Sequence, residues 1–496
     1  MTQQLEHEVS LDRISQEFGT ELLPGMYCMP NYIVPKPHSD DWRLVNDLSA
    51  GSFSLNSMVD RQKITGFPLD NLSQLGELLM KNHFSKPGKR FVVWKSDIAE
   101  AYRICPMHVL WQLKQAMRIQ GRLRIDRVNL FGGSASGAIF ISLNALVAWI
   151  AKYREKIDCL IYVDDSFGVD EMGLIEWYEP YNEGYPIHQT RLLKLWDRIG
   201  IPHKRKKQLN GGRLTVLGIE VDANECSFTL PKESKDRLEK ELGVWSQKGV
   251  RKRVKEWQQL AGWINWSFNV FPLLRPALNN IYAKLKGKGQ EAKVWANTAI
   301  REDLLWAREK MKKKSDGVLV LKSLAWEIDE ATCVMKTDAC PEGFAFWYPA
   351  SKEGFMTPTP EGTSASSIIF YESLAVLSAL HDAHLIYPSH SKFVIYTDNF
   401  TTVSMFNSLR ALPEYNCIIK TAIDILLEGS HDLRVLHIAG DDNGVADTLS
   451  QSQFMRALSL QPGLKIQSFQ PYLRFERRQL PPLLQPPRVT LGADLC

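Results

Sequence analysis

The stretch LIYVDDSFGV, residues 160–169, sets two adjacent carboxylates, Asp164 and Asp165, into a run that is otherwise rich in β-forming residues. Aspartate is disfavoured in strands, and two neighbouring negative charges repel each other. The pair therefore predicts a break in the strand, a tight hairpin turn that presents both carboxylates at its tip. Their mutual repulsion favours a bound cation. For this pair alone, an ordinary turn is an equally good interpretation.

A third carboxylate stands in an earlier strand-like run. In KSDIAEAYRICP, residues 95–106, we expect Asp97 at the end of the strand and Tyr102 beneath the same site. Carboxylates from two adjacent strands can converge if divalent cations neutralise them, and Mg²⁺ prefers oxygen ligands. Two such ions about 4 Å apart can activate an attacking hydroxyl and stabilise a leaving phosphate oxygen. The three acids are thus a candidate two-metal site.

The order of the motifs around these acids resembles that of reverse transcriptases. Six segments carry the resemblance, in chain order: VPKPHSDDWRLVNDLS, KSDIAEAYRICP, VNLFGGSASG, YVDD, GIPHKRKKQL and VLGIEVD. The resemblance implies that Asp97 and Asp164 are metal ligands and that Asp165 supports them. One departure is LFGG in place of the common LPFG, with Leu130 where the family carries a proline that would stiffen the loop.

The same resemblance implies a set of nucleotide-binding residues: Lys36 and Arg43 at the triphosphate, Tyr102 against a ribose 2′-hydroxyl, Phe131 and Gly132 beside base and sugar, and Lys207 near the pyrophosphate. Fixed positive charge suits a triphosphate, and arginine can contact it through two hydrogen bonds. Simpler roles exist for three of them: a surface charge for Lys36, a core aromatic for Tyr102 and a turn glycine for Gly132. Lys206 is the alternative to Lys207.

Positive charge is concentrated in one part of the chain. Residues 201–316 hold 25 Lys and Arg against 13 Asp and Glu, whereas the net charge of the whole chain is +4. Such an excess favours a polyanion as partner, although solvated helix faces would also explain it. Within it, residues 257–282 resemble the thumb helices of retroelement polymerases, and their aromatic residues can equally form a helix core. Lys and Arg around that core would hold a duplex by its phosphates without reading its sequence.

Four further acids follow residue 330, one in each expected element: Asp338, Glu372, Asp398 and Asp447. Their segments, MKTDACPEGFAFWYP, FYESLAVL, VIYTDNFTTV and HIAGDDNGVADTLS, are typical of a strand, a helix, a strand end and a helix start. The arrangement resembles the ribonuclease H fold, in which four acids hold two Mg²⁺ that cut the RNA strand of a hybrid. The last segment is close to the closing motif of gypsy-type and tyrosine-recombinase (DIRS-like) retroelements.

Each of these acids has a simpler interpretation when it is taken alone. Glu372 would be a solvated helix charge, Asp398 a turn residue and Asp447 a helix-start acid. Residues 441–442 are expected to be loop acids. We expect His437 to serve strand and loop structure rather than to act as a catalytic base.

At 496 residues the chain is too long for a single core, and with 44% hydrophobic and 23% charged residues it has the composition of a globular protein. The resemblance implies a multidomain α+β protein, a right-hand polymerase with fingers, palm and thumb, followed by an α/β ribonuclease H-like domain. The expected domains are 1–225, fingers and palm; 226–329, a helical, basic thumb or connection; 330–455, the ribonuclease H-like domain; and 456–496, a Pro-rich tail or linker.

The N-terminus is polar and acidic rather than signal-like, and the longest apolar stretch, residues 138–151, is expected to be a buried helix too short to span a bilayer. The eight cysteines show no zinc-site spacing, which favours reduced thiols. The expected location is intracellular, cytoplasmic or nuclear, without a membrane partner. The oligomeric state stays open.

Together these patterns predict an RNA-directed and DNA-directed DNA polymerase, a nucleotidyltransferase, with a ribonuclease H endonuclease domain, from an LTR-type or DIRS-like retrotransposon. The resemblance implies two Mg²⁺ in each site, with Mn²⁺ as an alternative ion. It implies RNA or DNA primer–template and deoxynucleoside triphosphates as partners. The alternative is a host-retained relic that binds nucleic acid without catalysis, and such a relic should have lost a metal ligand, whereas all seven acids are present. A repair polymerase would not explain the second group of acids.

Overall fold

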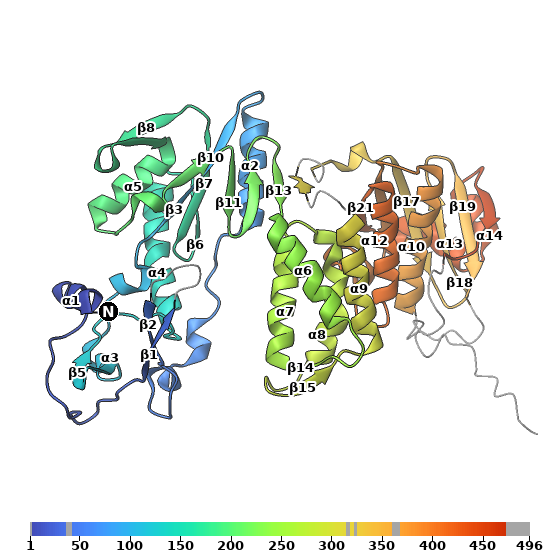
Figure 1. Cartoon of the computed structure of the whole chain (residues 1–496). Coiled ribbons are helices and arrows are strands. Elements are labelled where there is room, and N and C mark those ends of the chain that lie inside the picture. Colours follow the sequence, from blue (N-terminus) through green and yellow to red (C-terminus); the bar gives the residue numbers. More distant parts are fainter. Residues whose placement is uncertain (1, 36–41, 314–317, 322–324, 360–367, 473–496) are drawn as a thin grey trace, which may run out of the picture. The chain divides into compact units, whose positions relative to one another are not determined.

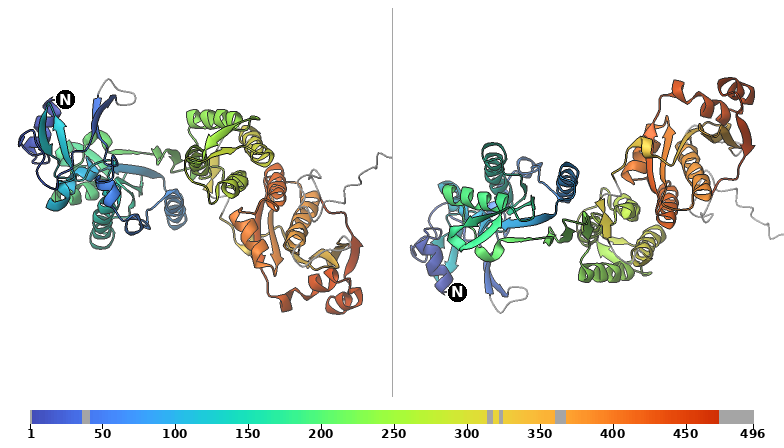
Figure 2. Two further views of the ribbon diagram at one scale, coloured as in Figure 1. Left: turned by 90° about the horizontal axis from the view of Figure 1, so that it is seen from below. Right: turned by 90° about the horizontal axis from the view of Figure 1, so that it is seen from above.

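The computed structural model describes residues 2–35, 42–313, 318–321, 325–359 and 368–472. The chain mixes helices and strands and divides into two compact units, Met1–Phe228 and Thr229–Cys496. Figure 1 labels many of the elements of each unit, and Figure 2 gives two further views. The first unit ends at Phe228, and the second holds the rest of the chain.

A four-stranded antiparallel sheet forms the centre of the first unit, in the order β10–β3–β7–β6. Its strands are β3 (Phe91–Asp97), β6 (Leu160–Tyr162), β7 (Asp165–Glu171) and β10 (Leu209–Gly211). Helices α4 (Ser136–Trp149) and α5 (Ile187–Ile199) share a core with this sheet, in which Trp94 of β3 is packed with Phe140 and Trp196. The strands that carry the predicted acids are therefore held by a packed helical layer.

Helix α4 is longer than the sequence suggests, because a π-helical turn, η4 (Ile150–Arg154), continues it. The 19 residues Ser136–Arg154 are long and apolar enough to cross a membrane by length and composition alone, and 33% of an 18-residue window within them is buried. This corrects the expectation of a shorter, buried helix. Phe140, Val147 and Ala151 pack into the core of the first unit. Another face of the helix carries exposed apolar side chains, those of Ile139, Leu143, Leu146, Trp149 and Tyr153.

Short hairpins and helices complete the first unit. The hairpins are β1 (Asn31–Pro35) with β2 (Trp42–Asn46), β4 (Ala116–Ile119) with β5 (Arg122–Ile125), β8 (Ile175–Tyr178) with β9 (Glu183–Pro186), and β11 (Arg213–Val216) with β12 (Ile219–Asp222), and β13 (Ser227–Thr229) follows. The helices are α1 (Thr2–Ser10), α2 (Leu72–Ser85) and α3 (Val109–Gln112), with 3₁₀ turns η1 (Leu55–Met58), η2 (Arg61–Ile64), η3 (Ala101–Ile104), η5 (Glu179–Tyr181) and η6 (Arg205–Lys207). Two of these turns, η3 and η6, carry the predicted nucleotide-binding residues Tyr102 and Lys207.

A six-stranded mixed sheet forms the centre of the second unit, in the order β21–β20–β17–β18–β19–β22. Its strands are β17 (Cys333–Ala339), β18 (Gly343–Tyr348), β19 (Glu353–Pro358), β20 (Lys392–Thr397), β21 (Asp432–His437) and β22 (Lys465–Ser468). β17, β18 and β19 form an antiparallel meander, while β20 pairs in parallel with both β17 and β21. Because parallel neighbours end at the same edge of a sheet, Asp338 near the end of β17 and Asp398 just after β20 come together.

Helices cover both faces of this sheet. They are α10 (Ile368–Ile386), α11 (Phe400–Ser408), α12 (Asn416–Gly429), α13 (Gly444–Ser450) and α14 (Phe454–Leu460). Phe344 and Phe346 of β18 belong to the core with α10 and α12, whereas Ala345 and Trp347 belong to the core with α13 and α14. Successive side chains of a strand point to opposite faces, so a strand buried on both faces has the unbroken apolar sequence seen in GFAFWY.

The helices before residue 314 belong to the same unit. They are α6 (Lys232–Trp245), α7 (Val254–Ser267), α8 (Asn279–Leu285) and α9 (Thr298–Lys313), with the 3₁₀ turn η7 (Pro272–Leu278), the hairpin β14 (Arg251–Arg253)–β15 (Lys293–Trp295), and then β16 (Val318–Val320) and η9 (Ile328–Glu330). Asp303 of α9 is 1% exposed and accepts hydrogen bonds from Asn416 and Lys420 of α12, at 3.0 and 2.7 Å. Leaving such a buried carboxylate unpaired would be costly, so this contact holds α9 on α12. The helices before residue 314 are thereby joined to the helical layer of the second unit.

Part of the expected Pro-rich tail is folded. Ala457 of α14 and Leu464 are buried in the core beneath β18, and β22 pairs in parallel with β19 at the sheet edge. The stretch is short and lacks a regular apolar period, so its sequence alone gives no sign of structure. The strands that it meets, β18 and β19, lie more than a hundred positions earlier in the chain.

Candidate active sites

The adjacent aspartates lie at a two-residue hairpin turn. β6 is followed by Val163 and Asp164, and β7 begins at Asp165. Val163 has a φ of 56°, in the left-handed region that β-branched residues rarely adopt. The Val163 carbonyl accepts a hydrogen bond from Asn144 of α4 at 2.7 Å, and the Asp164 carbonyl accepts one from the Ile98 amide at 3.1 Å. These contacts offset a backbone strain of about 1–3 kcal/mol and fix the turn.

Asp97 and Asp165 are direct partners in the antiparallel β3–β7 pair, so their side chains share one face of the sheet. Each carboxylate meets a lysine: Lys207 Nζ lies 3.0 Å from Asp97 Oδ2, and Lys95 Nζ lies 3.0 Å from Asp165 Oδ2. Burial and the charges of Asp165 and Asp97 raise the pKa of Asp164. The three acids therefore act on one another electrostatically, with two lysines balancing part of their charge.

Tyr102 lies in η3, beside the acidic turn. The centroid of its ring is 4.7 Å from that of Phe131 and 5.6 Å from that of Phe140 in α4. Burial and the negative charge of Asp164 raise the pKa of the Tyr102 hydroxyl. Tyr102 thus packs against the core and lies within electrostatic reach of the acids at the same time.

The loop after Leu130 is held by a side chain from another segment. Gly132 has a φ of 96°, which favours glycine, and Phe131 beside it is 60% exposed. Asn56 of η1 donates from Nδ2 to the Gly132 carbonyl at 2.9 Å and accepts at Oδ1 from the Ser134 amide at 2.7 Å. Asn56 therefore restrains the loop that lacks the proline of the related motif.

The remaining nucleotide-binding predictions have different outcomes. Lys36 lies outside the described residues, and the side chain of Arg43 in β2 does so too. Lys207, half-exposed in η6, reaches the acidic site through Asp97. That contact is the reason to favour Lys207 over Lys206.

A second acidic cluster lies in the second unit. Asp338 of β17, Glu372 of α10 and Asp398 after β20 each bring a carboxylate oxygen to within 4.8 Å of the others. Asp338 and Glu372 are 5% and 4% exposed. Thr397 Oγ1 donates to Glu372 at 3.2 Å, and Ser450 Oγ donates to Asp338 at 2.5 Å. These hydroxyls orient the two buried carboxylates.

Crowding of the carboxylates makes their charged forms unfavourable. Burial, with the charges of Asp338 and Asp398, raises the pKa of Glu372 to about 9. Burial also raises the pKa of Asp338 to about 6, with contributions from Asp398 and Asp447. Burial and the negative charge of Asp447 raise the pKa of Asp398 as well. The fourth predicted acid, Asp447, thus lies within electrostatic range of the other acids.

Asp447 lies in the first turn of α13, where a helix-start acid was expected, and Gln451 Nε2 donates to its Oδ1 at 2.5 Å. His437 ends β21, and its ring stacks on Phe400 with centroids 3.7 Å apart. Burial raises the pKa of Asp398, and the nearby His437 partly offsets this by lowering it. His437 therefore lies within electrostatic range of Asp398, and its stacking on Phe400 agrees with the expected structural role.

Both clusters have the donor chemistry of a divalent-cation site. Asp338, Glu372 and Asp398 could hold a metal ion, because their donors are hard carboxylate oxygens and a divalent charge would offset the burial and the repulsion that raise their pKa values. Asp97, Asp164 and Asp165 offer the same kind of donor at the tip of the hairpin.

Three residues that support the first acidic cluster or its neighbouring loop were not predicted from the sequence. Lys95 stands two positions before Asp97, and the period of a strand places both on one face, so that signal was present. Asn56 and Asn144 reach the site from distant segments, and nothing in their own surroundings in the sequence marks them.

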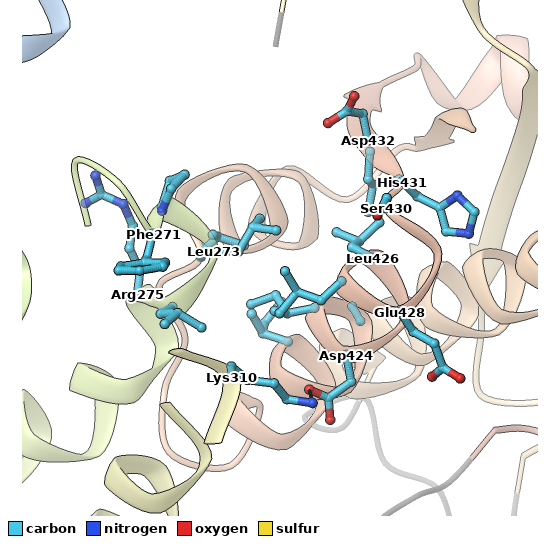
Figure 3. Close-up of a pocket in the computed structure, with 18 of the residues that line it drawn as sticks. Phe271, Leu273, Arg275, Lys310, Asp424, Leu426, Glu428, Ser430, His431 and Asp432 are labelled. Carbon is cyan, nitrogen blue, oxygen red and sulfur yellow. Dashed lines mark ion pairs between the residues drawn. The ribbon is translucent and has the colours of Figure 1, made fainter. Parts of the chain in front are cut away.

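A cavity of about 1130 Å³ lies elsewhere in the second unit, between the 271–275 segment, α12 and β21 (Figure 3). Lys310 and Asp424, labelled there, form an ion pair at 2.7 Å. Among the described residues that line this cavity, none is one of the seven predicted acids. The cavity is therefore separate from both clusters.

No protein-family model and no curated protein matches the chain. Solved structures with a similar fold include foamy viral protease–reverse transcriptase complexes. One with double-stranded DNA has a TM-score of 0.48 at 15% identity, covering 88% of this chain and 69% of that one. A second complex with double-stranded DNA has a TM-score of 0.46 at 16% identity, covering 95% of this chain and 83% of that one. A complex with an RNA/DNA hybrid has a TM-score of 0.43 at 15% identity, covering 88% of this chain and 53% of that one. The likeness is remote, so the functional argument rests on the two acidic clusters.

Proposed function

We propose that the chain is an RNA- and DNA-directed DNA polymerase with a ribonuclease H activity, encoded by a retroelement. The observation that carries the proposal is the presence of two acidic clusters of different architecture in one chain. The first cluster lies at the turn between β6 and β7, beside the end of β3. The second lies at the ends of β17 and β20 and on helix α10, which covers that sheet.

In the first cluster, Asp97 and Asp164 would hold divalent ions, and Asp165 would support them. Mg²⁺ bound there supplies Lewis acidity to the triphosphate and to the attacking primer hydroxyl. Lys207 provides fixed positive charge on the Asp97 side of the site, where it can bind the pyrophosphate. Tyr102 and Phe131 form an aromatic surface at the sugar, and Lys36 and Arg43 are proposed contacts of the triphosphate.

In the second cluster, Asp338, Glu372, Asp398 and Asp447 would hold the ions that promote hydrolysis of the RNA strand. Thr397 and Ser450 keep two of the carboxylates oriented through their hydroxyls. The raised pKa of Glu372 means that this carboxylate takes up a proton when no cation balances its neighbours. Ion binding would therefore be coupled to proton release, and affinity would rise with pH.

The finer assignment to a DIRS-like element rests on the segments NDLSAGSFSLNSMVDR and LAGWINWSF and on the HIAGDDNGVADTLS motif. An inactive relic that binds nucleic acid is the second candidate. The intact set of seven acids and the pairing of Asp97 with Asp165 favour the active enzyme.

Primer extension on a poly(rA) template with Mg²⁺ tests the polymerase. The wild-type chain should extend the primer and Asp164→Asn should not, because the amide removes a metal-binding charge. Asp158→Asn is the matched control, since this exposed aspartate precedes β6 on the same hairpin. Robust extension by Asp164→Asn would overturn the assigned role, and an inactive wild-type chain would favour the relic.

A labelled RNA–DNA hybrid tests the nuclease. We expect cutting by the wild-type chain and by the control Asp441→Asn, whose carboxylate is exposed in η11 (Gly440–Asn443), but not by Asp398→Asn. A wild-type chain that leaves the hybrid intact would reduce the second unit to a scaffold.

A further inference from the structure

The segment that joins Asp97 to Tyr102 has an unusual backbone. Glu100 has φ 60° and ψ 27°, a left-handed conformation, and it immediately precedes the 3₁₀ turn η3 that carries Tyr102. A non-glycine residue holds such a conformation only where its surroundings support it. The contacts of this segment therefore bear on where Tyr102 lies.

Glu100 is supported from the N-terminal segment. Arg13 Nη1 donates to Glu100 Oε2 at 2.6 Å, and Lys204 Nζ lies 3.5 Å from the other carboxylate oxygen. The hydrogen bond from Arg13 is the main reason that the pKa of Glu100 is lowered. The residue two positions before Tyr102 is thus anchored by charge.

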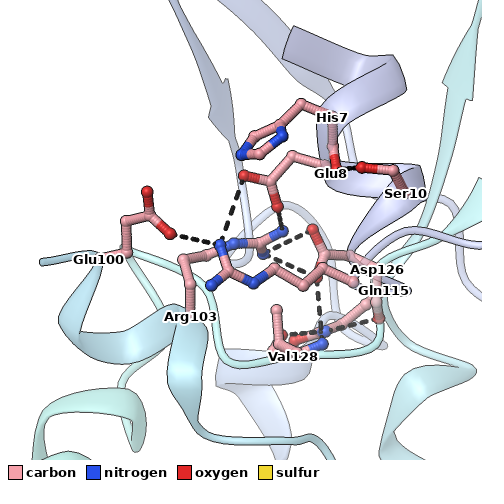
Figure 4. Close-up of polar contacts among 9 residues, drawn as sticks. His7, Glu8, Ser10, Glu100, Arg103, Gln115, Asp126 and Val128 are labelled. Carbon is pink, nitrogen blue, oxygen red and sulfur yellow. Dashed lines mark hydrogen bonds and ion pairs between the residues drawn. The ribbon is translucent and has the colours of Figure 1, made fainter. Parts of the chain in front are cut away.

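Arg103, directly after Tyr102, is also anchored in part by the N-terminal segment (Figure 4). Its Nη1 donates to both carboxylate oxygens of Asp126, at 2.8 and 2.7 Å, and its Nη2 donates to Glu8 of α1 at 2.5 Å. Asp126 is 1% exposed and Arg103 is largely buried, so these bonds are shielded from solvent.

The N-terminal segment is itself docked by its backbone. Ile14 forms an antiparallel bridge with Asp126, the Arg127 amide donates to the Arg13 carbonyl at 2.8 Å, and the Ser15 amide donates to the Ile125 carbonyl at 2.9 Å. Arg13 is therefore presented to Glu100 from a fixed backbone, just as Glu8 is presented from a helix.

We propose that Glu8 and Arg13 are positioning residues for Tyr102, and that the N-terminal segment thereby sets how strictly the polymerase site excludes ribonucleotides. The inference rests on the proposed polymerase function. Tyr102 lies between two anchored neighbours while its ring rests on Phe131 and Phe140. If either anchor is released, the ring can shift away from the sugar, and the space for a 2′-hydroxyl grows.

The test uses the full chain with charge-neutralised variants. Arg13→Gln and Glu100→Gln each remove one partner of the ion pair, and the double variant removes both. Neutral substitutions are used because Glu8 lies 3.8 Å from Arg13 and Lys204 lies 3.5 Å from Glu100, so a charge swap would create new like-charge contacts. Asp12→Asn is the matched control. Asp12 belongs to the same N-terminal segment, but it pairs with Arg127 and has no contact with η3 among those the structure describes. Ribonucleotide and deoxynucleotide incorporation give the discrimination ratio, and hydrogen exchange in peptides covering residues 98–107 reports the anchoring directly.

Each single variant should lower the discrimination ratio by about three- to fivefold, the range of a partly exposed ion pair, mainly through KM for the ribonucleotide. Exchange in 98–107 should speed up in both single variants, the double variant should change each readout no further than the larger single change, and Asp12→Asn should change neither. Hydrolysis of the hybrid by the second unit should stay constant throughout, which separates positioning from general loss of fold.

Exchange rates equal to those of the wild-type chain in the single variants, or two single effects that simply add in the double variant, overturn the anchoring. Faster exchange with unchanged discrimination overturns the link to Tyr102. A wild-type chain that extends no primer overturns the proposed function, and the role in sugar selection with it, while the exchange data still decide whether the anchor exists.

Discussion

Replacing Glu372 by glutamine should stabilise the chain when no divalent ion is present. Burial and two neighbouring carboxylates raise the pKa of Glu372 to about 9, against an ordinary value of 4.5. In the unfolded chain this group loses its proton near pH 4.5, whereas the folded protein keeps it up to about pH 9. Between these values the folded state binds more protons, so the free energy of unfolding falls as pH rises.

The size of the effect follows from the shift. Each pH unit in that interval costs about 1.4 kcal/mol, so between pH 4.5 and pH 7 the wild-type protein loses about 3 kcal/mol through this one group. Glutamine has the shape of the protonated acid and cannot ionise, so the free energy of unfolding of Glu372→Gln does not fall with pH through this residue. For a unit of this size we expect a rise in Tm of about 6–12 °C at pH 7, falling to none near pH 4.5.

Thermal unfolding in EDTA at pH 5, 6, 7 and 8 measures this difference. Asp441→Asn removes one negative charge from an exposed position and should follow the wild-type protein at every pH. Adding Mg²⁺ should narrow the gap at pH 7, because the ion binds the folded wild-type cluster better than the variant. A Glu372→Gln variant that is no more stable than wild type at pH 7, or a gap that does not depend on pH, would refute the reasoning.

Three further predictions concern the supports of the two sites. Ser450→Ala removes the hydrogen bond that lowers the pKa of Asp338, now about 6, so the acidic limb of the nuclease pH profile should move to higher pH. Asn144→Ala removes the hydrogen bond to the strained Val163 carbonyl; it should cost about 1 kcal/mol in chemical denaturation and reduce primer extension while hybrid cleavage continues. Gly132→Ala places a side chain at a φ of 96° and should destabilise its loop by about 1–2 kcal/mol, raising KM for the nucleotide in steady-state extension.

Local features of the sequence were enough to place most of the predicted acids on their elements. Asp97 ends β3, the Val163–Asp164 turn separates β6 from β7, and Asp447 opens α13. Strand propensity, turn chemistry and helix-start preferences act over a few residues, so a short window of sequence carries them. The same holds for GFAFWY, whose unbroken apolar run indicates a strand buried on both faces.

The structure alone decided which of these elements meet and what supports them. The pairing of Lys207 with Asp97, the hold of Asn56 on Gly132 and the bond from Arg13 to Glu100 each join residues more than seventy positions apart. The same is true of β22, which completes a sheet from within the expected tail. Such contacts arise because folding brings distant segments together to bury apolar surface and to satisfy buried polar groups, and no local pattern specifies the partner. The sequence by itself determined which acids the chain offers for a metal site, and the tertiary structure determined how those acids are grouped, balanced and held.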